Sequence, residues 1–394
     1  MKALKSMRLH IGIFGKTNVG KSSLLNKISD QSVSIVSDTA GTTTDVVEKS
    51  MELLPVGPVT FLDTAGLDDK TDLAEKRIEK TMKIVNRCDV AVIVCDYNGI
   101  DDYEKALIKK LEELKIPYLI VVNKSDIKKT VIDGFKNIIY TSVAEDSDLV
   151  FKFKEAIVKL LPDDFINTPK IVGNLVSAKD TVILVVPIDK EAPKGRLILP
   201  QVQTIRDLLD SNCLTYVVKE TELKDAIDNL KIPPALVVTD SQAFKKVAEI
   251  VPDSIPLTSF SILFARLKGD LKEFTDGASA VESLKDGDKV LILESCTHHA
   301  IDDDIGRVKI PNLLRQKTGK NLVIENYAGH DFPDITGYKL IVHCGACMTN
   351  RREVLSRILI ANDKNVPITN YGVVISYCLG ILPRALKIFE SKNM

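Results

Sequence analysis

The stretch Gly15-Lys16-Thr17-Asn18-Val19-Gly20-Lys21-Ser22 decides the fold of the first part of the chain. It lies between a short apolar run (9–14) and a helix-like run (23–28), which is the context of a phosphate-binding loop. The two glycines let backbone N–H groups point at phosphates, Lys21 places a cation beside the β and γ oxygens, and Ser22 offers a hydroxyl to Mg²⁺. The helix N-terminus adds positive partial charge. We expect residues 15–22 and the adjoining Ser23 to bind a nucleotide.

A second motif, Asp63-Thr64-Ala65-Gly66, follows the apolar run 61–62. The carboxylate of Asp63 can hold Mg²⁺ through water, and the N–H of Gly66 can reach a γ-phosphate. Because that contact disappears with the phosphate, the segment is expected to sense hydrolysis.

A third motif, Asn123-Lys124-Ser125-Asp126, follows the apolar run 119–122 and predicts which base is bound. The carboxylate of Asp126 can accept two hydrogen bonds from guanine, whereas adenine would leave that charge unpaired in the pocket. Ser142 and Val143 lie where a last base-contacting loop is expected. The predicted ligand is GTP with Mg²⁺.

Alternation of apolar and amphipathic runs predicts an α/β fold with mainly parallel sheets. We expect a P-loop GTPase domain over residues 1–165, then two smaller α/β domains over 170–267 and 268–394, with a linker near 161–169. Expected strands in the first domain are 9–14, 59–62, 90–94 and 118–122, with a helix over 104–114. The middle stretch has expected strands at 181–187, 214–218 and 235–238 and helices at 203–209, 223–230 and 244–250; it carries no ligand motif and is interpreted as a packing or dimerisation module. The last stretch has expected strands at 290–293, 322–325, 340–342 and 373–375.

Composition limits the classes of function. The chain has 394 residues, 45% of them hydrophobic, and its 53 basic and 54 acidic residues nearly cancel. No global positive field favours nucleic acid or an anionic membrane, so we expect neither partner. The N-terminal apolar run is too short for a signal peptide or a membrane span, which indicates a cytoplasmic protein. The 7 cysteines do not form a secreted disulfide pattern.

A second chemical site is expected near the end of the chain, where Cys296-Thr297-His298 is followed by His343-Cys344-Gly345-Ala346-Cys347. Both motifs come directly after expected strands, so they can meet at one edge of a sheet. The residue types alone leave three alternatives open: a structural zinc site, an iron–sulfur cluster, or a redox dithiol of Cys344 and Cys347. With three cysteines in the motif, an iron–sulfur cluster needs a fourth ligand of another kind or an open iron.

The three nucleotide motifs, in this order, resemble the TrmE and Era class of GTPases. The resemblance makes 41–45 the first switch loop, with Thr43, or next to it Thr42, as a Mg²⁺ ligand. It makes Asn18 a K⁺ ligand and Glu75 the acidic catalytic residue beside Lys21 and Thr43, although Glu75 also fits a solvated charge. Leu67 replaces the glutamine of many GTPases, which predicts slow hydrolysis, and Asn18 predicts that potassium stimulates it.

The Cys/His motifs behind such a domain resemble the HydF family of [FeFe]-hydrogenase maturation proteins, over essentially the whole chain and including 186–196. The resemblance implies a homodimer that binds a [4Fe–4S] cluster and carries the diiron precursor of the hydrogenase active site. It implies cluster thiolates at Cys296, Cys344 and Cys347, with His298 and His343 in the motif's histidine positions. Glu294 or water is a candidate for the fourth position. The implied partners are the radical enzymes HydE and HydG and the apo [FeFe]-hydrogenase.

Two other functions remain as alternatives. One is a ribosome- or RNA-associated regulatory GTPase with a structural zinc site, and the other is a redox enzyme that uses the cysteine pair without metal. His299 and His330 are interpreted as surface residues or supporting residues behind the ligands. Cys88, Cys95, Cys213 and Cys378 are interpreted as core packing.

Overall fold

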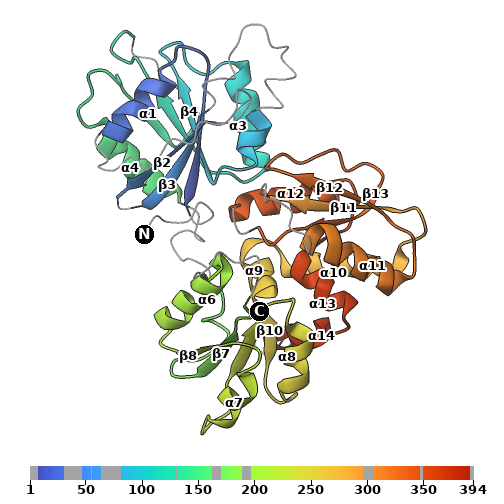
Figure 1. Ribbon diagram of the computed structural model, residues 1–394. Helices are drawn as coiled ribbons and strands as arrows, with labels where there is room; N and C mark the ends of the chain where they lie inside the picture. Colours follow the sequence, from blue (N-terminus) through green and yellow to red (C-terminus); the bar gives the residue numbers. More distant parts are fainter. Residues whose placement is uncertain are drawn as a thin grey trace. The chain divides into compact units, whose positions relative to one another are not determined.

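The computed structural model (Figure 1) describes residues 8–30, 47–54, 56–63, 81–128, 131–161, 170–188, 197–295, 305–346 and 349–390. The chain divides into two compact units, Met1–Thr168 and Pro169–Met394. The expected linker at 161–169 falls at the division.

The first unit is built on a six-stranded sheet in the order β2-β3-β1-β4-β5-β6. All neighbours pair in parallel except β2, which runs antiparallel to β3. The strands are β1 (Leu9–Phe14), β2 (Val47–Leu53), β3 (Gly57–Asp63), β4 (Val90–Cys95), β5 (Tyr118–Val122) and β6 (Ile138–Tyr140), and the helices are α1 (Lys21–Asp30), α3 (Asp102–Glu113) and α4 (Leu149–Leu160).

Both faces of this sheet are buried, because alternate strand residues enter two different hydrophobic clusters. Ile11 and Ile13 enter one cluster with Phe153 of α4, whereas Phe14 and Ile93 enter the other with residues of α3. A parallel strand that is buried on both faces has a continuous apolar sequence, which is why these strands could be found from the sequence.

The second unit contains two four-stranded parallel sheets, β10-β9-β7-β8 and β12-β11-β13-β14. The first sheet is formed by β7 (Thr181–Val185), β8 (Leu214–Val218), β9 (Leu236–Thr239) and β10 (Leu257–Ser259), with helices α6 (Leu199–Asp210), α7 (Leu223–Asp228), α8 (Phe244–Ile250) and α9 (Phe260–Lys268). The second is formed by β11 (Lys289–Glu294), β12 (Val323–Ala328), β13 (Tyr338–His343) and β14 (Ile368–Asn370), with helices α10 (Leu271–Ser279), α11 (Ile310–Thr318), α12 (Arg351–Asp363), α13 (Tyr371–Cys378) and α14 (Leu382–Glu390). A 3₁₀ turn (Ala280–Ser283) and a π-helical turn (Ile305–Lys309) complete it.

One hydrophobic core joins the two sheets of the second unit. Leu184 and Val238 of the first sheet belong to the same buried cluster as Leu291 and Ile341 of the second. Helix α9 packs against α6 of the first sheet and against α12 and α13 of the second. The predicted α/β fold class is confirmed. The two sheets of the second unit share one hydrophobic core.

The strand expected at 373–375 is wrong, because this segment lies in the helix α13. Asn370 caps the helix: its side-chain oxygen accepts a hydrogen bond from the backbone N–H of Val373 at 2.9 Å. Residues 372–376 are all buried. A helix buried on every side has no polar stripe, so its apolar run is easily taken for a strand. The actual strand, β14, comes directly before it.

Among the described helices, none has both the length and the apolar character that a membrane crossing requires.

Candidate functional site

The phosphate-binding loop joins the end of β1 to the start of α1, and two of its glycines cannot be replaced. Gly15 and Gly20 have φ of +138° and +103°, which side chains rarely adopt. A Cβ at Gly15 would lie 2.1 Å from the carbonyl oxygen of Val94, and a Cβ at Gly20 would lie 2.2 Å from Nδ2 of Asn123. The loop is therefore packed closely on the end of the sheet and on the third motif.

Lys21, the first residue of α1, has its ammonium group inside the loop. Its side chain is buried, and Nζ donates to the carbonyl oxygens of Gly15 at 2.6 Å and Lys16 at 2.8 Å. Loop carbonyls thus hold the ammonium where the sequence places the phosphates. The neighbouring Lys16 is ion-paired with Asp101, which caps α3.

Asn123 connects three of the segments that the sequence assigns to the nucleotide: the phosphate loop, its own motif and the loop at Val143. Its Nδ2 donates to the carbonyl oxygen of Val19 at 2.8 Å, and its Oδ1 accepts from the backbone N–H of Val143 at 2.9 Å. Lys124 adds a second connection, because its Nζ donates to the carbonyl oxygen of Asn18 at 2.8 Å. The phosphate loop and the base-recognition segments therefore form one structure.

A cavity of about 1060 Å³ opens between these segments. Its lining contains the predicted residues Lys16, Thr17, Asn18, Gly20, Lys21, Ser22, Ser23, Asn123, Lys124, Asp126, Ser142 and Val143. Asp126 is exposed, so its carboxylate can meet a base. The chemistry of the lining, with lysines and loop amides at one end and a carboxylate at the other, fits a guanine nucleotide.

Asp63 stands at the carboxyl end of β3 and is buried, with Ile13 of β1 beside it in the sheet. This position is next to the start of the phosphate loop, as a Mg²⁺-associated carboxylate requires. Thr42, Thr43, Gly66 and Glu75 lie outside the described residues.

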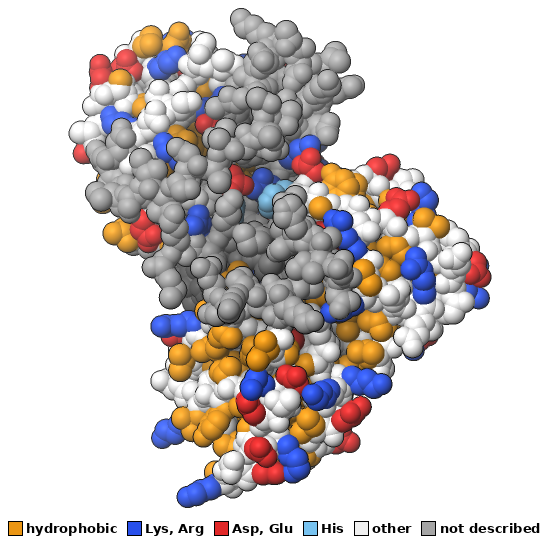
Figure 2. All heavy atoms as spheres, in the orientation of Figure 1, with side chains coloured by type: hydrophobic (Ala, Val, Ile, Leu, Met, Phe, Trp, Pro, Cys, Tyr) orange, Lys and Arg blue, Asp and Glu red, His pale blue; other side chains and the backbone are white. Residues whose placement is uncertain are grey.

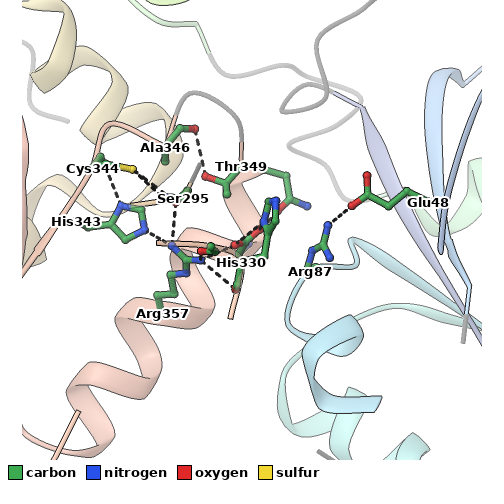
Figure 3. A network of polar contacts seen from close by, with 12 residues as sticks. Glu48, Arg87, Ser295, His330, His343, Cys344, Ala346, Thr349 and Arg357 are labelled. Carbon is green, nitrogen blue, oxygen red and sulfur yellow. Dashed lines mark hydrogen bonds and ion pairs between the residues drawn. The ribbon is translucent and has the colours of Figure 1, made fainter. Parts of the chain in front are cut away.

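The Cys/His segment lies at the carboxyl edge of the second unit's β11–β13 pair (Figure 3). Leu293 of β11 is beside His343 of β13, and the N–H of Cys344 donates to the carbonyl oxygen of Leu293 at 2.8 Å. One residue beyond the end of β11, the N–H of Ser295 donates to Sγ of Cys344 at 3.3 Å. The residue that precedes Cys296 in the chain is thus in contact with Cys344.

Cys344 fits the role of a thiolate ligand, because its side chain is only half-buried and its sulfur accepts an N–H bond. Cys296, His298 and Cys347 lie outside the described residues. Among the residues that are described, no three His, Cys, Asp or Glu side chains gather as a metal site.

His343 is engaged by protein groups at both ring nitrogens. Nδ1 donates to the carbonyl oxygen of Cys344 at 2.7 Å, which leaves Nε2 to accept from Nη1 of Arg357 at 2.8 Å. Burial, and then the positive charge of Arg357, lower the pKa of His343 to about 3, so the ring is neutral near pH 7. In this arrangement His343 supports the loop, and its use as a metal ligand would require Arg357 to move.

Arg357 of α12 is the functional candidate that sequence reasoning missed. It is 2% exposed, and its guanidinium contacts Ser295, His343, Glu353 and the carbonyl oxygens of Gly329 and His330 at 2.7–3.0 Å. These groups come from the ends of β11, β12 and β13 and from α12 (Figure 3). The sequence feature that could have identified Arg357 is its position as a charged residue within the largely apolar run 354–361.

The segment after Cys344 is anchored at its far end as well. Ala346 is buried with φ of +52°, and its carbonyl oxygen accepts from the backbone N–H of Thr349 at 3.3 Å. The buried Lys268 of α9 donates to the carbonyl oxygen of Thr349 at 2.7 Å. Ala346 and Thr349, the described residues on either side of 347–348, are therefore both held by hydrogen bonds, and Lys268 comes from the helix shared by the two sheets.

Two further residues named from the sequence have protein partners. The carboxylate of Glu294 accepts from the hydroxyl of Tyr371 at 3.3 Å and lies 3.8 Å from Arg307. His330 contacts the buried Glu353 through Nδ1 at 3.2 Å. Cys88, Cys95 and Cys213 are buried as predicted, and burial raises the pKa of Cys95 to about 12.

The fold and the nucleotide site define a P-loop GTPase domain, and a family model described as 50S ribosome-binding GTPase matches residues 10–124. Behind it, the model of the hydrogen maturase F dimerization domain matches residues 171–269, and that of the hydrogen maturase F tetramerization domain matches 272–388. These two models together cover more than half of the chain. The chain belongs to the hydrogen maturase F family, as the sequence resemblance predicted.

Curated relatives are similar to the GTPase part. The tRNA modification GTPase MnmE of Prochlorococcus marinus is 44% identical over 121 residues, which are 30% of this chain and 26% of the relative. MnmE of Desulforamulus reducens is 37% identical over 166 residues, 40% of this chain and 35% of the relative. This chain thus spans about a quarter to a third of the length of these relatives. Their similarity confirms the GTPase class.

Among solved structures, Era of Aquifex aeolicus bound to GDP and AlF₄⁻ is 18% identical, with a TM-score of 0.32 over 61% of this chain and 97% of that chain. The G domain of the FeoB iron transporter of T. maritima is 20% identical, with a TM-score of 0.28 over 39% of this chain and 98% of that one. Similarity at this level carries no functional argument.

Proposed function

We propose that this protein is a GTP-binding and GTP-hydrolysing scaffold that holds a [4Fe–4S] cluster and carries the diiron precursor of the [FeFe]-hydrogenase active site. The observation that carries the proposal is the contact between Ser295 and Cys344. It brings the chain position next to Cys296 against Cys344 in a protein that also has the complete sequence signature of a guanine-nucleotide site. A switch protein needs only the nucleotide site, and a simple metal protein needs only the cysteines.

The cluster would be held by the thiolates of Cys296, Cys344 and Cys347. When bound, it would supply an iron that has no fourth cysteine, at which a small ligand or the cargo can exchange. His298 remains a candidate ligand for the iron that has no fourth cysteine. His343 is proposed to support the loop through Cys344 and Arg357 rather than to bind iron. Water is preferred to Glu294 as the fourth ligand, because the carboxylate of Glu294 already contacts Tyr371 and lies near Arg307.

In the nucleotide site, the N–H groups of the phosphate loop and Lys21 would bind the phosphates, and Asp126 would accept from guanine. Ser22, Thr43 and Asp63 would hold Mg²⁺ directly or through water, with Gly66 contacting the γ-phosphate. Glu75 would act near the attacking water, and Asn18 would bind K⁺ beside the phosphates. Leu67 offers no side-chain amide for that water, which supports slow hydrolysis, and a K⁺ ion held by Asn18 would stimulate it.

Oligomerisation is supported by the matched dimerization and tetramerization domains. Strand β8 is an edge strand, and Leu214, Tyr216 and Val217 on it are exposed, as is Leu209 of α6. Figure 2 shows hydrophobic side chains gathered over the region of α6 and β8. An exposed apolar edge strand is a template for pairing with another chain. We infer that β8 forms the homodimer interface with a second copy of this chain.

The proposed partners are HydE and HydG, which would supply the cargo, and the apo [FeFe]-hydrogenase, which would receive it. The test is to incubate the chain with HydE and HydG without oxygen, separate it, and mix it with apo-hydrogenase. Hydrogen evolution is expected after wild-type incubation and not after incubation of Cys344→Ser. Equal activation by both would contradict the proposal. The alternative of a zinc-stabilised RNA-associated GTPase predicts no activation and bound zinc.

A further inference from the structure

The hydroxyl of Ser295 lies between a buried cation and the sulfur of Cys344. Its Oγ accepts from Nη1 of Arg357 at 2.9 Å and lies 3.6 Å from Sγ of Cys344. Ser295 is itself 2% exposed. The backbone N–H of the same residue donates to that sulfur at 3.3 Å. One residue therefore contacts one cysteine twice: its N–H donates to the sulfur, and its hydroxyl oxygen accepts from the thiol in this structure.

The direction of these hydrogen bonds follows from the chemistry of the groups. A guanidinium is a donor without acceptor atoms, so Arg357 must donate to Oγ. A thiolate at Cys344, the form that binds a metal, has no hydrogen to donate, so the serine hydroxyl would then donate to the sulfur that lies 3.6 Å away. Arg357 is fixed in this position by Glu353 at 2.7 Å and by the carbonyl oxygens of Gly329 and His330.

We propose that Ser295, oriented by Arg357, is a positioning residue that holds the Cys344 sulfur and raises the reduction potential of the cluster bound there. This inference rests on the proposed cluster-binding function. Reduction adds negative charge to a cluster and its sulfurs, so hydrogen-bond donors to a ligating sulfur stabilise the reduced form more than the oxidised form. Ser295 and Arg357 thereby contribute to the reduction potential of the cluster, which its ligands alone do not determine.

The main variant is Ser295→Ala, because it removes the hydroxyl while the backbone N–H and the charge pair of Arg357 with Glu353 remain. Ser261→Ala is a matched control, since it removes a hydroxyl that bonds Ser241 at 2.8 Å in the same unit and does not contact Cys344. Arg357→Lys keeps the charge but loses the forked geometry, and Ser295→Thr keeps the hydroxyl. Thermal unfolding of each variant establishes that it is folded.

The measurement is a potentiometric titration, without oxygen, of the full chain reconstituted with iron and sulfide. The readouts are iron and sulfide per chain and the EPR signal of the reduced cluster. We expect the wild-type iron content in Ser295→Ala but a more negative midpoint potential, with a smaller negative shift in Arg357→Lys. Ser261→Ala and Ser295→Thr are expected to keep the wild-type potential.

If the wild type and Ser295→Ala both form a cluster and the two clusters have the same midpoint potential, this inference is overturned and the proposed function is left intact. A folded wild-type chain that forms no cluster would overturn both. Loss of iron from folded Ser295→Ala, with retention in Ser295→Thr, would contradict the inference about the potential, because the hydroxyl would then be needed for cluster binding itself.

Discussion

The side-chain amide of Asn123 donates to the carbonyl oxygen of Val19 at 2.8 Å, although 104 residues separate them in the chain. The same side chain accepts from the N–H groups of Lys124 at 2.8 Å and Val143 at 2.9 Å. A single asparagine thus holds the base-recognition segments against the phosphate loop. Its main effect is on the shape of the nucleotide site rather than on contact with the base.

Replacing this asparagine, as Asn123→Ala, is expected to weaken both GTP and GDP binding. A buried hydrogen-bonding group without a partner costs about 1–3 kcal/mol, and ~1.4 kcal/mol is tenfold in affinity. We expect an affinity loss of about 10- to 100-fold by isothermal titration calorimetry. The exposed Asn98 of the same unit provides the control Asn98→Ala, with wild-type affinity expected. Unchanged binding by Asn123→Ala would contradict the account of this residue.

Asp126→Asn is expected to change which base is bound. The amide replaces one acceptor oxygen by a donor, which no longer matches the two donors of guanine but does match the 2-oxo group of xanthine. GTP affinity should fall by ~100-fold or more, while XTP affinity rises. Competition between the two nucleotides for the site measures this. Retention of guanine preference would show that Asp126 does not read the base.

Lys21→Ala should abolish nucleotide binding and leave the metal content of the C-terminal unit unchanged. The buried ammonium donates to the carbonyl oxygens of Gly15 and Lys16 in the phosphate loop, and the cysteine site belongs to the other compact unit. Fluorescent-nucleotide titration and iron analysis of the same preparation test both parts. Simultaneous loss of nucleotide and iron would argue against independent sites.

Much of the fold could be predicted, because its strands carry an unusually clear signal. The predicted bounds of β1, β5, β8 and α8 agree with the structure. The edge strands β2, β6 and β10 were not predicted, because β6 and β10 have 3 residues each and the longer β2 has a largely polar sequence. The helix α13 was taken for a strand because it is buried on all sides, and its cap at Asn370 was the signal that distinguishes the two.

The nucleotide site was predictable for a different reason: its residues are fixed by short motifs. The contacts around Cys344 were harder to predict from the sequence. Arg357 and Glu353 reach the cysteine segment from α12, through side-chain contacts that no spacing in the sequence encodes. His343 carried a metal-ligand pattern, but its two ring contacts to Cys344 and Arg357 are visible only in three dimensions. A last α/β domain over 268–394 was expected, but not that residues 272–388 match a tetramerization domain.

Val217→Lys is expected to produce a smaller assembly than the wild type. Val217 is exposed on the edge strand β8, where a lysine opposes pairing with a second copy. Light scattering coupled to size exclusion gives the mass. Phe151→Lys, an equally radical change at an exposed apolar residue of α4, is the control and should keep the wild-type mass. An unaltered mass for Val217→Lys would place the dimer interface elsewhere.

The central claim is tested most directly by the metal content of the chain purified without oxygen, with Cys344→Ser as the comparison. Iron, sulfide and zinc are measured, and EPR spectra are recorded after reduction with dithionite. The account predicts iron and sulfide in the wild type and a reduced-cluster signal that is lost in Cys344→Ser. Stoichiometric zinc, with no cluster formed even after iron and sulfide are supplied, would contradict it.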